Sequence, residues 1–70
     1  MTIRLNGDSF EVDGPLTVGE LLHRLDIDPR RIAVEHNLVV VKRLAFDDTT
    51  INAGDEVEIV NFVGGGSSAP

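Results

Sequence analysis

The residues best suited to do chemistry stand at the C-terminal end of the chain, which reads NFVGGGSSAP. An alternating apolar pattern stops at Val63, and the glycines Gly64, Gly65 and Gly66 follow it directly. We interpret this run as a slim tail that can extend, because glycine adopts backbone conformations that other residues avoid. Seven extended residues would reach up to roughly 24 Å from the domain.

Such a tail suits a terminal carboxylate that must react inside another protein. A carboxylate is a poor electrophile until it is activated, for instance as an acyl-adenylate, and an activating enzyme has to draw it into a nucleotide pocket. Under this interpretation the domain supplies the recognition surface and the tail supplies the reacting group. A phosphate-binding loop is a weaker interpretation, because no helix follows the glycines to present backbone amides.

The other polar residues form no convincing catalytic or metal-binding pattern. His23 and His36 lie on different predicted elements, and the chain has no cysteine. Asp47 and Asp48 are adjacent, whereas the carboxylates of a calcium loop alternate along the chain. We therefore expect no metal site, and we expect His23 to lie on the exposed side of a helix.

Size and composition predict one small domain in a reducing cytoplasm. The chain has 70 residues, a net charge of −6 and no cysteine, and small secreted domains usually need disulfides. Phosphate backbones repel an acidic surface, so we expect no nucleic-acid partner. No apolar run approaches a membrane span, and the N-terminal stretch lacks the apolar segment of a signal peptide. The negative charge either only keeps the chain soluble or complements a basic partner.

The first half of the chain predicts a hairpin followed by a helix. Two alternating runs at 2–6 and 9–13 flank Asn6-Gly7, a dipeptide typical of tight type I′ turns. Thr17 then starts a capping box that Glu20 completes. An apolar stripe at helical spacing follows, made of Val18, Leu21, Leu22 and Leu25. We expect this helix to end near Leu25 or Asp26, since Pro29 disfavours its continuation.

The second half predicts three more strands. Two are expected at 32–36 and 38–42, joined tightly at His36-Asn37, and the last at 56–63. The stretch between the second and third of these reads as irregular, with Phe46 filling the core. The resulting order ββαβββ, with one main helix and a mixed sheet of about five strands, predicts an α+β fold of the β-grasp type. The domain should span residues 1–63, and residues 64–70 should form a flexible tail.

The last predicted strand has an apolar outer face. Val60 and Phe62 alternate with inward-facing positions, and Val39 or Val41 of the neighbouring strand is expected to join them. Single exposed apolar residues need no explanation. A contiguous patch beside the root of the tail would instead indicate a docking surface for an activating enzyme, to which Gly64 would also contribute.

In its order of motifs the chain resembles the ThiS family, the ubiquitin-like β-grasp sulfur carriers of thiamin thiazole synthesis. The resemblance covers nearly the whole chain. It is carried by the NG hairpin, by TVGELL, by Asn37, Arg43 and Phe46, and by the closing stretch AGDEVEIVNFVGGG. Lys42 departs from the family, which commonly has proline before the arginine.

The resemblance implies a mechanism and its partners. A ThiF-type enzyme would use MgATP to adenylate a terminal glycine carboxylate, a persulfide would replace AMP with sulfur, and a ThiG-type thiazole synthase would take that sulfur. The carrier would then be a covalent co-substrate, not an enzyme, and would bind no cofactor itself. The matching glycines are Gly65 and Gly66. We expect the carrier alone to be a monomer, because it must fit two different enzymes.

The residues SSAP after Gly66 depart from the family, whose members act through a terminal Gly-Gly. We hypothesise that a protease trims the chain after Gly66, with cleavage after Gly65 as the alternative; loss of carrier activity would also fit. Three other functions remain open: a carrier for molybdopterin synthesis, a protease-matured carrier for cysteine synthesis, and a non-covalent ubiquitin-like binding module. The absence of proline in IVNFVGGG favours the thiazole role over the molybdopterin role.

Overall fold

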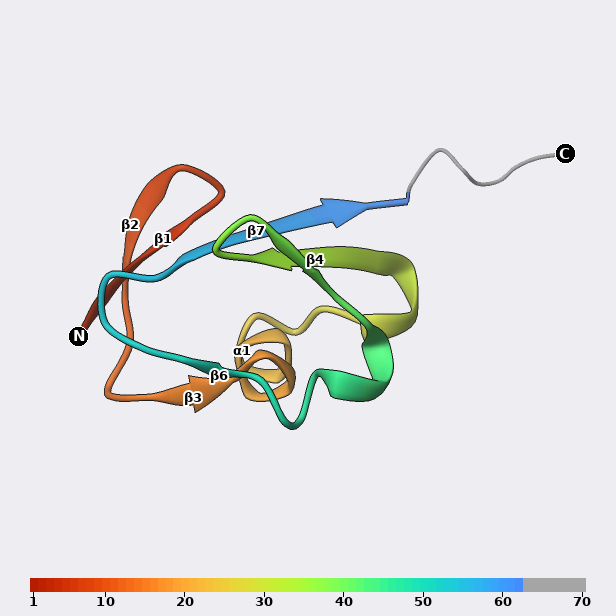
Figure 1. Cartoon of the computed structure of the whole chain (residues 1–70), viewed down its shortest axis with the longest axis horizontal. Helices are drawn as coiled ribbons and strands as arrows, with labels where there is room; N and C mark the ends of the chain where they lie inside the picture. The colour runs from red at the N-terminus through yellow and green to blue at the C-terminus, as the bar shows by residue number, and fades with distance from the viewer. Residues whose placement is uncertain (63–70) are drawn as a thin grey trace, which may run out of the picture.

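The computed structural model describes residues 1–62, so the domain boundary expected after residue 63 and the tail predicted at 64–70 lie outside the described residues. One five-stranded sheet forms the centre of the molecule, and a single α-helix packs on one of its faces (Figure 1). The sheet strands are β1 (Thr2–Leu5), β2 (Asp8–Glu11), β4 (Ile32–His36), β5 (Val39–Val41) and β7 (Glu56–Asn61). The remaining elements are the short strands β3 (Leu16–Thr17) and β6 (Thr50–Ile51), helix α1 (Val18–Arg24) and the 3-10 helices η1 (Pro29–Arg31) and η2 (Arg43–Ala45).

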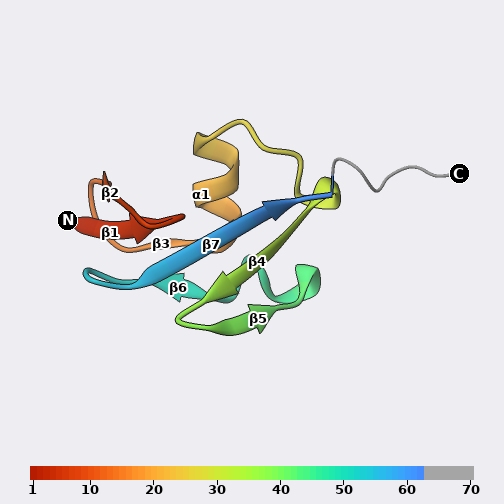
Figure 2. The ribbon, with the colours of Figure 1, turned by 90° about the horizontal axis from the view of Figure 1, so that it is seen from above.

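The strand order across the sheet is β2-β1-β7-β4-β5. The first and last strands, β1 and β7, run parallel in the middle, and every other neighbouring pair in this sheet is antiparallel. Seen from above, β7 runs diagonally between β1 and β4 and carries the chain to one end of the molecule (Figure 2). The mixed five-stranded β-grasp predicted from the sequence is confirmed.

Two-residue turns close both hairpins of the sheet. Asn6 and Gly7 have φ of 51° and 86°, which confirms the type I′ geometry predicted for this dipeptide. The second turn was predicted one residue too early. It is formed by Asn37 and Leu38, with φ of 51° and 71°, because His36 still pairs with Val39 in the ladder between β4 and β5.

The capping box predicted for α1 is present. The amide of Glu20 donates to Thr17 Oγ1 at 3.0 Å, and the amide of Thr17 donates to the Glu20 carboxylate at 2.8 Å. The helix begins at Val18 and ends at the cap residue Leu25. Among the helices of residues 1–62, none is long and apolar enough to cross a membrane.

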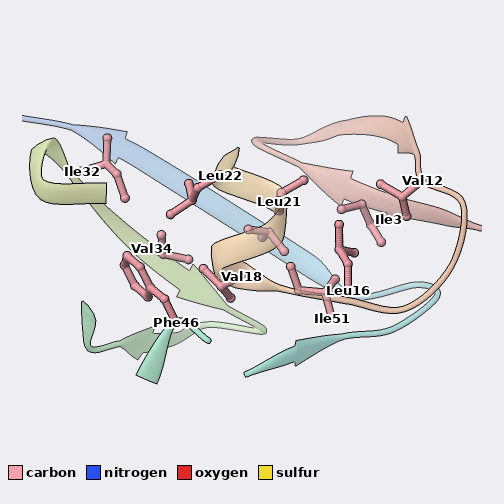
Figure 3. Packing of buried hydrophobic residues seen from close by; sticks show 11 residues of the cluster. Ile3, Val12, Leu16, Val18, Leu21, Leu22, Ile32, Val34, Phe46 and Ile51 are labelled. Atoms are coloured by element: carbon pink, nitrogen blue, oxygen red, sulfur yellow. The ribbon is translucent and has the colours of Figure 1, made fainter. Parts of the chain in front are cut away.

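The core lies between α1 and the sheet and is entirely aliphatic except for Phe46. That ring is 5% exposed and packs in one cluster with Val18 and Val34, as its expected role in the core requires (Figure 3). The pair formed by β3 and β6 was missed in the sequence, where the second of these read as irregular. It joins Leu16 to Ile51, both buried, but strands of two residues carry no detectable period.

Candidate docking surface at the tail exit

Strand β7, which leads towards the glycine run, is held on both edges by an asparagine side chain. Asn6 Oδ1 accepts a hydrogen bond from the amide of Ile59 at 2.7 Å, and Asn37 Oδ1 accepts one from the amide of Glu56 at 2.9 Å. At the far end of the strand, the amide of Phe62 donates to the carbonyl of Arg31 at 2.9 Å. These contacts fix the direction in which the chain leaves the sheet.

An exposed apolar patch lies on the face of the sheet opposite α1. The ladder between β4 and β7 places Val60 beside Ala33 on this outer face, and strand alternation places Phe62 on the same side. Val60 is 56% exposed and Phe62 is 53% exposed. Sequence reasoning expected both side chains on the outer face, and the structure places them there, beside the root of the tail.

The residue of β5 that joins this face is Val40, so the expectation for Val39 and Val41 is wrong. Val41 pairs with the buried Val34 and is itself half-buried against the core, and Val39 shares its helix-facing side. Val40 pairs with Glu35 on the outer face and is 66% exposed. The error follows from the turn, because moving a turn by one residue exchanges the two faces of the strand that follows.

We define the outer apolar patch as Val40, Val60 and Phe62. Glu35 lies between Val40 and β7 on this face. Glu58 lies directly opposite Glu35 on β7, so two exposed carboxylates stand beside the apolar side chains. Like charges in directly opposed positions weaken a sheet. An apolar patch with a charged border has the composition of a small protein-docking surface. Gly64, which was predicted to contribute to this docking surface, lies outside the described residues, as do Gly65 and Gly66, the predicted sulfur-carrying end.

A histidine and an aspartate pair at the opposite end of β7. His36 Nε2 lies 2.7 Å from Asp55 Oδ2, and the two side chains are 19% and 18% exposed. Partial burial alone would raise the pKa of Asp55, but hydrogen bonds from the Asn52 amide, the His36 ring and the Asn37 side chain outweigh it and lower that pKa. The pair joins the β4–β5 hairpin to the loop before β7, which is a structural role.

The described residues contain no metal-ligand cluster. Within residues 1–62 no three histidine, aspartate or glutamate side chains gather as a metal ion would require. His23 is exposed on α1, as expected. A groove of about 320 Å³ beside α1 has a mixed lining, with Leu22, Ile27 and Phe46 next to the charged residues Arg43 and Asp47.

The hydrogen bonds from the amides of β7 to Asn6 and Asn37 were not predicted from the sequence. Asn6 was noted only for its turn, and Asn37 only for the family resemblance. The available signal was the same in both cases, an asparagine between two short apolar runs, since asparagine tolerates positive φ and offers a side-chain acceptor. The sequence contained no signal for which backbone amide each side chain would reach.

The fold is that of a β-grasp domain: one helix crosses a mixed sheet, and the first and last strands, β1 and β7, run parallel at its centre. The last strand leads towards the glycine run. A model of the ThiS family matches residues 3–66. The chain belongs to the ThiS family.

Solved structures with the same fold support this assignment. A crystal structure of the thiamine biosynthesis protein (ThiS) from Geobacter metallireducens superimposes with a TM-score of 0.83 at 43% identity, covering 94% of this chain and 100% of that chain. An NMR structure of a thiamine biosynthesis protein from the same organism gives a TM-score of 0.78 at 41% identity, covering 100% of this chain and 94% of that chain.

Two relatives known from sequence differ in how much of their own length this chain covers. The thiazole synthase of Paramagnetospirillum magneticum is 40% identical over 67 residues, which are 96% of this chain but 21% of that protein. The uncharacterized protein ycf40 of Porphyra purpurea is 41% identical over 66 residues, covering 94% of this chain and 93% of that protein. The chain thus spans about a fifth of the first relative and nearly all of the second.

Proposed function

We propose that this chain is a sulfur carrier for thiazole formation in thiamin biosynthesis, and that it is a co-substrate of enzymes and not itself an enzyme. The observation that carries the proposal is the family match over residues 3–66, which runs through the clamped strand β7 and includes Gly64, Gly65 and Gly66. We expect the carrier to act in the cytoplasm.

The proposed chemistry begins at the carboxylate of Gly66. This carboxylate attacks the α-phosphate of ATP on a ThiF-type enzyme, pyrophosphate leaves, and an acyl-adenylate forms. A persulfide sulfur then attacks the acyl carbon and AMP leaves, which gives an acyl persulfide. A thiol reduces the sulfur–sulfur bond and leaves a thiocarboxylate on the carrier. MgATP is bound by the activating enzyme and not by the carrier.

The identity of the acceptor is supported by two relatives named thiazole synthase. Each contains a segment similar to this chain that makes up about a fifth of its length, 21% in one and 22% in the other. A carrier segment within the same polypeptide as a thiazole synthase would be kept close to the enzyme that consumes its sulfur. We therefore propose a ThiG-type thiazole synthase as the partner that receives the sulfur, in preference to an acceptor in molybdopterin or cysteine synthesis.

The proposed docking site for the activating enzyme is the outer apolar patch of Val40, Val60 and Phe62. All three side chains are more than half exposed, and the patch ends at the residue where the described chain ends. A partner that covers it would hold the root of the tail against its own surface. The glycines after Val63 would then pass into a narrow channel, because they have no side chains to obstruct it.

The proposal requires a carboxylate on Gly66, so we also propose that a protease removes Ser67 to Pro70. Adenylation tests both steps together. The chain ending at Pro70 and a version ending at Gly66 would each be incubated with MgATP, labelled pyrophosphate and a ThiF-type enzyme. We expect exchange of pyrophosphate into ATP for the version ending at Gly66 and none for the longer chain. If neither supports exchange, the chain is better described as a non-covalent binding module.

A further inference from the structure

The positive charges of this acidic chain are concentrated where β7 leaves the sheet. The whole chain has only six lysine and arginine residues against twelve acidic ones. Four of the six belong to η1 and η2 or directly precede η2, and we call them the basic collar: Arg30, Arg31, Lys42 and Arg43. Both segments lie at the end of the molecule to which β7 points (Figure 2).

Contacts place the basic collar at the root of the tail. The carbonyl of Arg31 accepts the hydrogen bond from the amide of Phe62 at 2.9 Å, so η1 lies directly beside the exit point. Arg43 lines the same groove as Ile27 and Pro29, so η2 lies beside the start of η1. The two segments are therefore neighbours although they are distant in the sequence.

The charge of the basic collar is available to a partner. The side chains of Arg30 and Arg31 are 76% and 79% exposed, and Lys42 and Arg43 are exposed as well. Within residues 1–62, neither Lys42 nor Arg43 forms an ion pair with another described side chain.

Two carboxylates offset part of this charge. Asp28 accepts two hydrogen bonds from the Arg30 guanidinium, at 3.0 and 2.9 Å. These bonds, with one from the Arg30 amide, lower the pKa of Asp28 to about 2. Asp47 lines the groove next to Arg43. The four cations of the collar outnumber these two carboxylates, and the exposed residues Asp26 and Asp48 stand further along the same segments. The collar thus groups most of the positive charge of a molecule that is negative as a whole.

The length of the tail requires the activating enzyme to contact this surface. Four residues separate Phe62 from the carboxylate of Gly66, and four extended residues span at most about 14 Å. The nucleotide site of an adenylating enzyme must therefore come within about that distance of Phe62. The channel of the enzyme that admits the tail must then have its rim against the side chains around Phe62. These side chains include those of the basic collar.

We propose that the basic collar docks against an acidic rim around the channel through which the adenylating enzyme admits the tail. This inference rests on the proposed function and adds the chemistry of the partner surface. An acidic rim would repel the remainder of this acidic chain and attract only its tail-bearing end, so charge would orient the encounter before apolar contact forms. The net charge of the whole chain would suggest the opposite, a basic partner.

The test is steady-state adenylation by a ThiF-type enzyme with charge-reversed variants. The collar variant carries Lys42→Glu and Arg43→Glu. The matched control carries Arg4→Glu and Arg24→Glu, so it changes the net charge by the same amount through the two cations outside the collar. Arg4 pairs with Glu56 at the start of β7, away from the exit point, and Arg24 belongs to α1 on the opposite face of the sheet from the outer apolar patch. We expect the collar variant to raise the KM for the carrier about tenfold, as a loss of about 1.4 kcal/mol would. We expect kcat and the KM for ATP to stay unchanged, and the control to stay within about twofold of wild type.

Two further measurements make the test specific. A charge-neutral pair, Lys42→Gln and Arg43→Gln, should give an intermediate KM, and thermal melts should show that every variant is folded. The KM for the wild-type carrier should rise with salt more steeply than the KM for the collar variant, because screening weakens an attraction that the variant has already lost.

Three results would overturn the proposal. Equal effects of the collar variant and the control with Arg4→Glu and Arg24→Glu would indicate a response to net charge alone. A rise in the KM for ATP instead of the carrier would assign the collar to the nucleotide phosphates. A wild-type chain that supports no adenylation at all would refute the proposed function, and the docking proposal would fail with it.

Discussion

Asparagine performs two tasks at each hairpin turn of this protein. Asn6 and Asn37 both adopt φ of 51°, which most side chains avoid. Each also accepts a hydrogen bond from an amide of β7, at Ile59 and Glu56 respectively. Glycine could supply the conformation but not the acceptor, so a substitution by glycine would keep the turn and release one edge of the exit strand.

Leu38 is the position where local conformation and residue type disagree. Its φ is 71°, a left-handed conformation that is unfavourable for leucine, and its side chain is 78% exposed. The side chain therefore contributes little packing energy to offset the unfavourable backbone. We expect Leu38→Gly to increase the free energy of unfolding by up to about 1 kcal/mol. Urea denaturation would measure the change. Leu44→Gly, at a 94% exposed position in η2, is the control and should lower stability instead.

Asp55 should make stability depend on pH. Its pKa is lowered in the folded protein, so the ionised carboxylate stabilises the fold above the ordinary carboxyl pKa. That contribution is lost as the pH falls through the lowered value. We expect Asp55→Asn to be less stable than wild type at pH 7, and the difference to shrink steadily in urea melts carried out at increasingly acidic pH.

An unchanged difference between wild type and Asp55→Asn across that acidic range would contradict the inferred stabilising role of the carboxylate. The substitution Asp48→Asn, at an exposed carboxylate, is a suitable control. It should alter stability little at either end of the range.

Elements with a strong local signal could be predicted from the sequence, and elements defined by long-range pairing could not. The α1 cap and the first hairpin depend on residues that are three or fewer positions apart. The pairing of β3 with β6 joins Leu16 to Ile51, a contact that no local pattern encodes. The second turn was misplaced by one residue because His36, Asn37 and Leu38 offer no glycine to mark it.

That single misplaced turn also decided which residues were assigned to the candidate site. Val60 and Phe62 were placed on the correct face because β7 alternates over six residues. Val39 and Val41 were assigned to the wrong face because the position of the preceding turn determines which residues of β5 point to each face of the sheet. The basic collar was not predicted at all, since Arg30, Arg31, Lys42 and Arg43 come together only in the folded molecule.

The face assignment for β5 can be tested directly. We expect Val60→Ser and Phe62→Ser each to raise the KM for the carrier in adenylation several-fold, because each removes apolar contact from the docking surface. Val40→Ser should do the same. Val39→Ser is a matched control, since Val39 is as exposed as Val40, at 66%, but faces the other side. Equal effects at positions 39 and 40 would contradict the proposed surface.

The capping box of α1 should contribute to the stability of the domain. We expect Thr17→Ala to lower the free energy of unfolding by about 1 kcal/mol, because it leaves the Glu20 amide without its acceptor. Glu20→Gln should retain most of the stability, since glutamine can complete the same box. Chemical denaturation of the two variants would show whether the loss is specific to the cap, and a Thr17→Ala variant as stable as wild type would refute it.

On the scale of the whole molecule, the described domain directs the chain along β7 towards one end and presents the outer apolar patch and the basic collar. Within residues 1–62 its core consists of aliphatic residues and Phe46, and β7 ends beside the outer apolar patch and η1. The proposed reaction takes place beyond this domain. Carrier function therefore depends on how the domain is held by its partner and on which residue ends the chain.

The most direct test of the proposed function is the intact mass of the protein isolated from its native cells. We predict a species that ends at Gly66 and carries the mass increase expected when sulfur replaces one oxygen of the terminal carboxylate. Alkylation of that thiocarboxylate should add one further group. A population that always retains Ser67 to Pro70, and never gains sulfur in cells making thiamin, would contradict the carrier function.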